Sequence, residues 1–201
     1  MSIVMRVFAT FVVVFWPALS GAAEQLKLAE ISAYLNGITT LQSDFRQFNA
    51  DGSVSTGTLY IRRPGRMRFE YDPPEQALVI AAASAVVIID QKSNQPSETY
   101  PLSRTPLSLI LDRDIDLTRA GMVRNARFDG TATIVTAFVP DEPDAGYIEL
   151  AFTDQPTRLR DWVITDATGG QTRIVLGELE TGMNLPAALF DAGRETSRAN
   201  R

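Results

Sequence analysis

Apolar and charged side chains alternate along residues 66–71, and this is the clearest pattern in the chain. Met67, Phe69 and Tyr71 fall on one face of an extended strand, while arginine and glutamate occupy the other face. Residues 59–63, on the other side of the Pro64-Gly65 turn signal, also read as a strand. The pattern predicts two neighbouring strands of a sheet with one apolar face, which must cover a core, a cavity or a partner.

Short extended segments follow one another along most of the chain. Turn signals such as Asp51-Gly52, Asp129-Gly130 and Thr168-Gly169-Gly170 separate them. The predicted strands cover residues 41–48, 56–62, 66–71, 77–82, 85–90, 99–102, 122–128, 131–139, 147–153, 158–166 and 171–179. Strands joined by such short turns pair with their neighbours as an antiparallel meander.

Two helices are predicted. Residues 25–36 carry apolar side chains at three- and four-residue spacing, and Gly37 ends this helix. Thr105-Pro106 resembles a helix start, and the apolar run 107–111 continues from it. We therefore predict a mainly β (α+β) fold, in which a strongly curved antiparallel sheet, or incomplete β-barrel, is covered by a helical lid and encloses an apolar cavity.

The first 23 residues have the features of a secretory signal peptide that is cleaved near Ala23. Arg6 precedes an apolar stretch over residues 7–19, which is shorter than the roughly 20 residues that span a bilayer. We expect a single domain over residues 24–193 and a disordered polar tail over residues 194–201. The simplest location for such an exported protein is the periplasm.

The chain contains neither cysteine nor histidine. Disulfides, thiolate chemistry and lipid attachment at a cysteine are therefore excluded, and the commonest general base and transition-metal ligand are missing. We predict no catalytic residue, no metal and no cofactor. Asp112, Asp114 and Asp116 alternate, but this stretch lacks the glycine and the terminal glutamate of a calcium loop.

The net charge is -5, and it becomes -6 when residues 1–23, which contain Arg6 and no acidic residue, are removed. A negative protein has no electrostatic attraction for nucleic acid or for an anionic membrane surface. We therefore expect no nucleic-acid partner.

Four groups of motifs occur in a fixed order along residues 31–190. They are Leu41-Gln42-Ser43-Asp44-Phe45-Arg46-Gln47 after the first helix; Gly57 to Tyr71, which contains Arg63-Pro64-Gly65, with Pro74 after it; Thr105-Pro106-Leu107; and Asp166 with Gly170-Gln171-Thr172, followed by Asn184-Leu185-Pro186 and Phe190. Their order and spacing resemble the periplasmic outer-membrane lipoprotein carrier family, LolA. Where that family has an Asp-Gly turn and then aromatic residues, this chain has the small and aliphatic residues 82–89.

The resemblance implies an incomplete barrel that holds the acyl chains of a lipoprotein while the lipoprotein crosses the periplasm. It implies loading from an inner-membrane ABC-type release complex, delivery to an outer-membrane acceptor and a monomeric carrier. By position, Arg63 matches the family's arginine that holds the lid closed through hydrogen bonds. Met67 and Phe69 match large apolar residues that line the cavity.

Besides the clasp residue Arg63, the predicted site residues form two groups. The cavity lining comprises Phe45, Met67, Phe69, Tyr71, Val87 and Ile89, and the lid side chains are Leu28, Ile31, Leu35, Leu107, Leu109 and Ile110. A plainer interpretation stays open for the clasp and for the cavity lining. Arg63 can be a solvated arginine, and the apolar strand face can be a permanently packed core.

Two other functions remain as alternatives to a carrier. The first is a lipid- or lipoprotein-sensing regulatory protein of the same fold. The second is an exported hydrolase, which the absence of histidine and cysteine disfavours.

Overall fold

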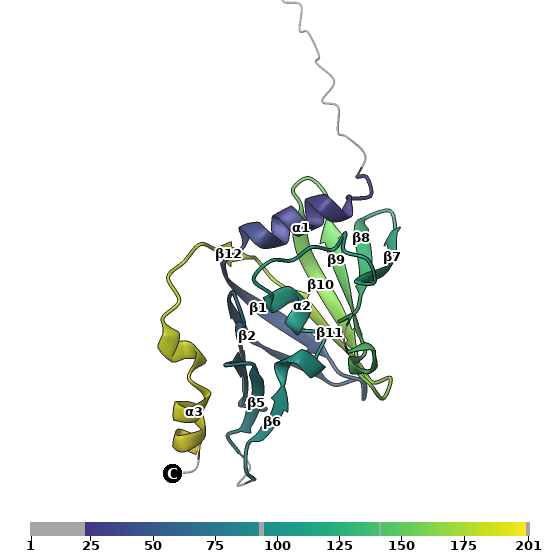
Figure 1. Cartoon of the computed structure of the whole chain (residues 1–201). Helices are drawn as coiled ribbons and strands as arrows, with labels where there is room; N and C mark the ends of the chain where they lie inside the picture. The colour runs from purple at the N-terminus through teal and green to yellow at the C-terminus, as the bar shows by residue number, and fades with distance from the viewer. Residues whose placement is uncertain (1–22, 93–94, 141, 200–201) are drawn as a thin grey trace, which may run out of the picture.

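One antiparallel sheet of twelve strands forms most of the protein (Figure 1). The structure is a computed structural model, and it describes residues 23–92, 95–140 and 142–199. The strands are β1 (Thr40–Phe48), β2 (Val54–Arg62), β3 (Arg66–Tyr71), β4 (Ala77–Ala82), β5 (Ala85–Asp90), β6 (Glu98–Pro101), β7 (Val123–Phe128), β8 (Ala132–Ala137), β9 (Tyr147–Thr153), β10 (Arg158–Thr165), β11 (Gln171–Leu176) and β12 (Glu180–Thr181). Their order is β6-β5-β4-β3-β2-β1-β11-β10-β9-β8-β7, with β12 beside β1. The predicted mainly β fold with a curved, unclosed antiparallel sheet is confirmed, and the enclosed cavity stays a prediction.

Gly57 lies at a tight point in this curved sheet. It pairs with Phe45 of β1 on one side and with Tyr71 of β3 on the other. A Cβ atom added to Gly57 would lie 2.1 Å from the backbone oxygen of Glu70, so only glycine fits there. Because Gly57 has no side chain, the rings of Phe45 and Tyr71 meet above it, edge to face, with their centroids 5.2 Å apart.

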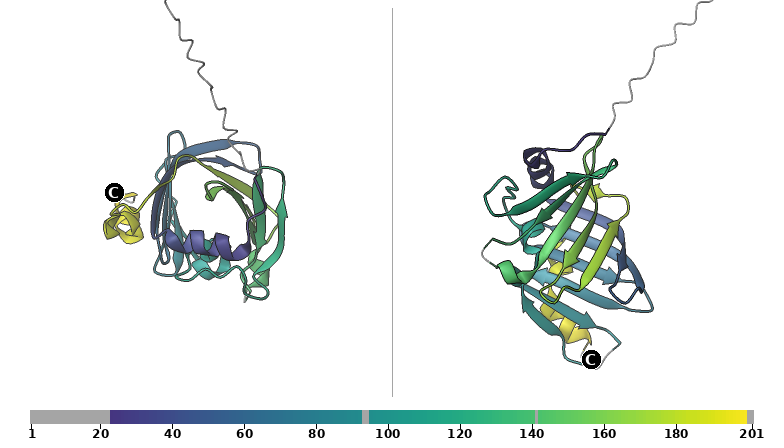
Figure 2. Two further views of the ribbon diagram at one scale, coloured as in Figure 1. Left: turned by 90° about the horizontal axis from the view of Figure 1, so that it is seen from above. Right: turned by 90° about the vertical axis from the view of Figure 1, so that its right-hand side faces the viewer.

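Helices α1 (Leu28–Gly37) and α2 (Ser108–Leu111) cover the open side of the curved sheet. In the left view of Figure 2, α1 lies across the gap between the two ends of the sheet, with α2 beside it. Both helices turn apolar side chains toward the concave face, where they join the main hydrophobic core. The predicted helical lid is therefore present.

The second helix is shorter than the sequence predicts. A 3-10 turn, η1 (Leu102–Arg104), precedes it, and α2 has only four residues. The Thr105 hydroxyl donates to the Leu102 carbonyl at 2.9 Å, so Thr105 closes the 3-10 turn and does not cap α2. A second 3-10 turn, η2 (Pro143–Ala145), lies between β8 and β9.

The chain after β12 returns along the outside of the sheet. It forms the 3-10 turn η3 (Ala187–Phe190) and the helix α3 (Ala192–Ala199), which lies outside the barrel in the left view of Figure 2. The expectation of a disordered tail from residue 194 is corrected by this helix. Asp191 accepts a hydrogen bond from the backbone N–H of Arg194 at 3.0 Å, and Glu195 pairs with Arg68 of β3 at 3.7 Å.

The predicted signal peptide lies almost wholly within residues 1–22, which are outside the described residues. Within the part of the chain that the structure describes, no helix is long and apolar enough to cross a membrane.

Candidate functional site

An aromatic cluster lies on the concave face of strands β1 and β3. Phe45 and Phe69 meet edge to face at a centroid distance of 5.2 Å, and Phe69 stacks on Tyr71 at 6.3 Å. Phe45, Phe69 and Met67 are almost completely buried. The alternation in residues 66–71 therefore predicts the correct face, and these side chains form part of the inner wall.

Tyr71 is the polar member of this cluster. Its hydroxyl donates to Oε1 of Gln47 at 2.6 Å. Burial raises the pKa of Tyr71 to about 12. The phenol therefore stays neutral at physiological pH, as an apolar interior requires.

Val87 and Ile89 do not belong to the inner wall, and their prediction is corrected. Strand pairing places Val87 beside Ile80 and Ile89 beside Leu78, in a second cluster on the outer face that Ala192 of α3 helps to cover. Val86, which joins the main core, holds the inward position on β5. The run 85–89 is apolar throughout because both of its faces are covered, so it has no alternation that could reveal the inward face.

The lid side chains fill the concave face in this structure. Ile31 and Leu35 of α1 and Leu109 and Ile110 of α2 are buried in the same cluster as Met67. Leu28 and Leu107 pack against this cluster while partly exposed. The structure thus shows a closed lid on an apolar interior and does not show an open cavity among these described residues.

The guanidinium of Arg63 joins the two covering segments. Its Nε donates to the carbonyl of Asp112 at 2.9 Å, just after α2. Its Nη1 donates to the carbonyls of Leu35, in a short hydrogen bond, and of Ile38 at 3.3 Å, at the end of α1. The last carbonyls of a helix have no partner within the helix, so an arginine side chain stabilises them well. The contacts are those of a clasp between α1 and the segment after α2.

Asn36 completes the same connection. Its Oδ1 accepts hydrogen bonds from Nη2 of Arg63 at 2.9 Å and from the backbone N–H of Ile115 at 3.0 Å. Its Nδ2 donates to the Ile115 carbonyl at 2.9 Å. One turn earlier on α1, the Ser32 hydroxyl accepts from the backbone N–H of Leu117 at 3.0 Å. Sequence reasoning missed Asn36 and Ser32, because each resembles an ordinary polar residue of a helix surface.

Burial and nearby charges shift the pKa of Arg63 in opposite directions. Burial lowers the pKa of Arg63, and the carboxylates of Asp112 and Asp114 partly oppose this shift. An arginine remains protonated at physiological pH under such a shift. The clasp is therefore a charged donor held among carbonyl acceptors.

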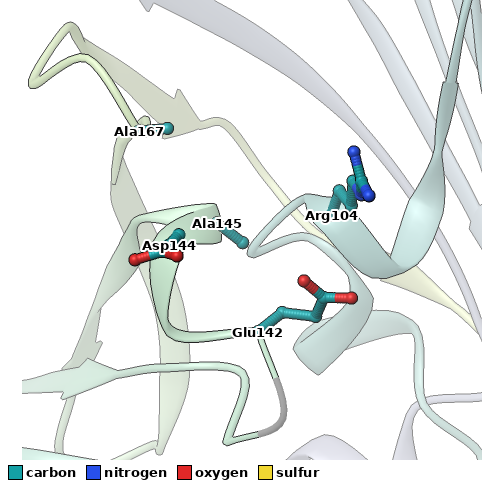
Figure 3. A pocket seen from close by; sticks show the side chains of 5 residues that line it. All are labelled: Arg104, Glu142, Asp144, Ala145 and Ala167. Carbon is teal, nitrogen blue, oxygen red and sulfur yellow. The ribbon is translucent and has the colours of Figure 1, made fainter.

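A pocket of about 390 Å³ is lined by residues that do not belong to the main hydrophobic core (Figure 3). Its lining includes Arg104 of η1, and Glu142 and Asp144 at η2. Charged side chains make this pocket unsuited to hydrocarbon. Within residues 23–92, 95–140 and 142–199, no cluster of three or more acidic residues is placed to hold a metal ion.

A curved antiparallel sheet with an apolar interior and a helical lid defines a class of proteins that can enclose apolar ligands. The family profile of the outer membrane lipoprotein carrier protein LolA matches residues 36–192. The chain belongs to this family, and the resemblance identified in the sequence is confirmed.

Individual relatives agree with the family profile. The chain is 27% identical to an outer-membrane lipoprotein carrier protein of Chromohalobacter salexigens, over 86% of this chain and 83% of the relative. It is 26% identical to the protein of the same name from Chromobacterium violaceum, over 86% of this chain and 85% of the relative. A crystal structure described as an outer membrane lipoprotein-sorting protein domain, from Vibrio parahaemolyticus, shares the fold with a TM-score of 0.54 and 10% identity, over 86% of this chain and 98% of that one.

Proposed function

We propose that this protein binds the acyl chains of lipoproteins inside its curved sheet and carries them through the periplasm from the inner to the outer membrane. The observation that carries the proposal is the apolar interior that α1 and α2 cover, with one arginine side chain bonded to both covering segments. Membership of the lipoprotein carrier family supports the choice of cargo.

A carrier can both bind and release an acyl chain if the chain replaces the lid side chains in the interior. An acyl chain in water costs about 0.8 kcal/mol per methylene, so a chain of a dozen methylenes costs on the order of 10 kcal/mol. In the closed protein, Ile31, Leu35, Leu109 and Ile110 already occupy the interior. A ligand replaces these contacts with similar ones, so the net affinity is a small difference between two large terms.

Opening the lid must break the polar clasp. Arg63 makes its contacts with carbonyls on both sides of the gap, and Asn36 repeats the connection. Moving α1 away exposes these groups to water, which replaces the lost hydrogen bonds. Because the net free energy of each hydrogen bond in water is only about 1 kcal/mol, the clasp can hold the empty protein closed without preventing loading.

The partners and location follow from the same proposal. Loading takes place at an inner-membrane ABC-type release complex, and delivery takes place at an outer-membrane acceptor. The carrier acts as a periplasmic monomer, after removal of the signal peptide near Ala23. We propose that it performs no catalysis, a view supported by a sequence without histidine or cysteine.

Loading and transfer test this proposal directly. Residues 24–201 are mixed with a detergent-solubilised acylated lipoprotein, and native mass spectrometry then detects a one-to-one complex after the detergent is removed. Addition of outer-membrane vesicles is expected to move the lipoprotein to the vesicle fraction. A protein that takes up no acylated lipoprotein contradicts the carrier role. Depletion that alters stress-response transcription but leaves lipoprotein sorting intact would support the sensing alternative.

A further inference from the structure

Trp162 carries a buried donor without a partner. Its indole Nε1 is the one buried side-chain nitrogen or oxygen, across the residues described here, that makes no hydrogen bond. The side chain of Trp162 is 0% exposed. Indole Nε1 can only donate, and a buried donor that is left unpaired costs about 1–3 kcal/mol. The closed protein therefore carries a penalty at this position.

The unpaired donor belongs to the interior that the lid covers. Trp162 lies on β10, paired with Ile174 of β11 and with Leu150 of β9. All three side chains are part of the main core, together with Ile31 and Ile110 of the lid. These lid side chains are pure hydrocarbon and cannot accept a hydrogen bond.

Other polar groups on the concave face of the sheet are satisfied. The Tyr71 hydroxyl donates to Gln47, and the Ser43 hydroxyl donates to the carbonyl of Asp44 at 2.8 Å. Trp162 is the exception in a wall that otherwise pairs its polar atoms. A buried polar atom without a partner calls for an explanation, and a partner supplied by a ligand is one.

We propose that the indole N–H of Trp162 donates to a carbonyl oxygen of the bound acyl lipid, in the ester group that joins an acyl chain to its headgroup. This inference rests on the proposed function. A carbonyl oxygen accepts hydrogen bonds without donating, so it complements a donor-only indole. Loading satisfies a donor that the closed lid leaves unpaired, and the hydrogen bond selects an acyl ester over plain hydrocarbon of equal length.

The small number of tryptophans allows the Trp162 indole to be observed by itself in an NMR spectrum. The protein has two tryptophans, and the other one is Trp16 within the signal peptide, so residues 24–201 contain Trp162 alone. A ¹⁵N-labelled sample therefore gives one indole cross-peak. Two ligands are compared: a short peptide whose N-terminal cysteine carries two ester-linked acyl chains, and the same peptide with two ether-linked alkyl chains of equal length.

The ester ligand is expected to move the indole proton downfield, and the ether ligand is not. The ester ligand should also bind about five- to tenfold more tightly than the ether ligand, which corresponds to one hydrogen bond of ordinary net strength. Trp162→Phe should remove this preference. The control variant Tyr60→Phe, which changes a side chain on the outer face of β2, should keep it.

The outcomes separate this inference from the proposed function. If both ligands bind equally and the ester leaves the indole peak in place, the inference is wrong while the carrier function stands. If neither ligand binds, both the inference about Trp162 and the proposed carrier function are wrong. The spectrum of the unsubstituted protein decides the question even if Trp162→Phe does not fold.

Discussion

Nη2 of Arg63 lies 2.9 Å from Oδ1 of Asn36, and this contact ties the turn after β2 to the last turn of α1. The same amide group binds both backbone polar groups of Ile115, four residues beyond the end of α2. One side-chain pair therefore connects the two parts of the lid over the interior.

Arg63→Leu tests the clasp. Loss of the guanidinium removes hydrogen bonds that hold the lid in the closed structure, so we expect the closed state to lose stability relative to an open one. We expect the empty protein to unfold at a lower temperature and the acyl ligand to bind more tightly, since less free energy is spent on opening. A change of about 1–3 kcal/mol corresponds to roughly 5- to 150-fold in affinity, with correspondingly slower release to vesicles.

Arg66→Leu is the matched control for this variant. Arg66 stands three residues away in the sequence, at the start of β3, and its side chain has no hydrogen bond or ion pair among the described residues. It should leave affinity and release unchanged. Equal behaviour of the two variants in a release assay would contradict a special role for Arg63.

Truncations of the lid and of the wall should have opposite effects on binding. Ile31→Ala and Phe69→Ala each remove a buried side chain, and each should lower the free energy of unfolding of the empty protein by about 2–5 kcal/mol. In the proposed exchange, Ile31 leaves the interior when the lid opens, so Ile31→Ala should strengthen ligand binding. In the proposed carrier Phe69 contacts the ligand, so Phe69→Ala should weaken ligand binding. Calorimetric titration of both variants measures the difference, and a change of the same sign in both would count against lid exchange.

Removal of residues 192–201 tests the outer helix. Arg68 is only 6% exposed because Glu70, Glu195 and the carbonyl of Leu189 surround it. Without α3, Arg68 loses Glu195 and the outer cluster of Leu78, Ile80 and Ile89 loses cover. Urea unfolding should show a loss of about 1–3 kcal/mol. Ligand affinity should stay constant, because α3 does not touch the interior; a large loss of affinity would show that the outer helix belongs to the site.

Tyr71 should affect stability at alkaline pH. Its pKa is raised from 10.0 to about 12 in the folded protein, so the folded state holds the phenol proton more tightly than the unfolded state. The resulting stabilisation is complete below pH 10 and is lost as the pH rises from about 10 to about 12. Tyr71→Phe should flatten part of this decline. Urea unfolding at pH 9, 10 and 11 measures it, and an unchanged slope in the variant would refute the assignment to Tyr71.

The sequence predicts those parts of the site that leave a periodic pattern. Alternation in residues 66–71 places Met67 and Phe69 on the inner face, because the outer face of β3 carries charged residues. On β5 both faces are apolar, so the sequence cannot distinguish Val86 from Val87 as the inward residue. The role of Arg63 in closing the lid came from family resemblance and stays a prediction, although its contacts fit that role.

Other parts depend on distant contacts that no local pattern encodes. Helix α3 has a polar sequence typical of a disordered tail, and its ion pair with Arg68 joins residues far apart in the chain. Asn36 acts through Ile115, which lies beyond α2. The unpaired indole of Trp162 becomes evident only when its neighbours are known. Tertiary contacts decide all three features.

Photo-crosslinking from position 69 tests most directly whether acyl chains occupy the interior. A photoreactive amino acid replaces Phe69 in residues 24–201, and a matched sample carries it at Val87 on the outer face. In a one-to-one complex with an acylated lipoprotein, we predict that position 69 captures the acyl chains. Position 87 should capture the protein's own residues 187–193, which share a groove with Val87. Capture of the lid helices from position 69 in the loaded complex would show that Phe69 belongs to a permanent core and would contradict the account.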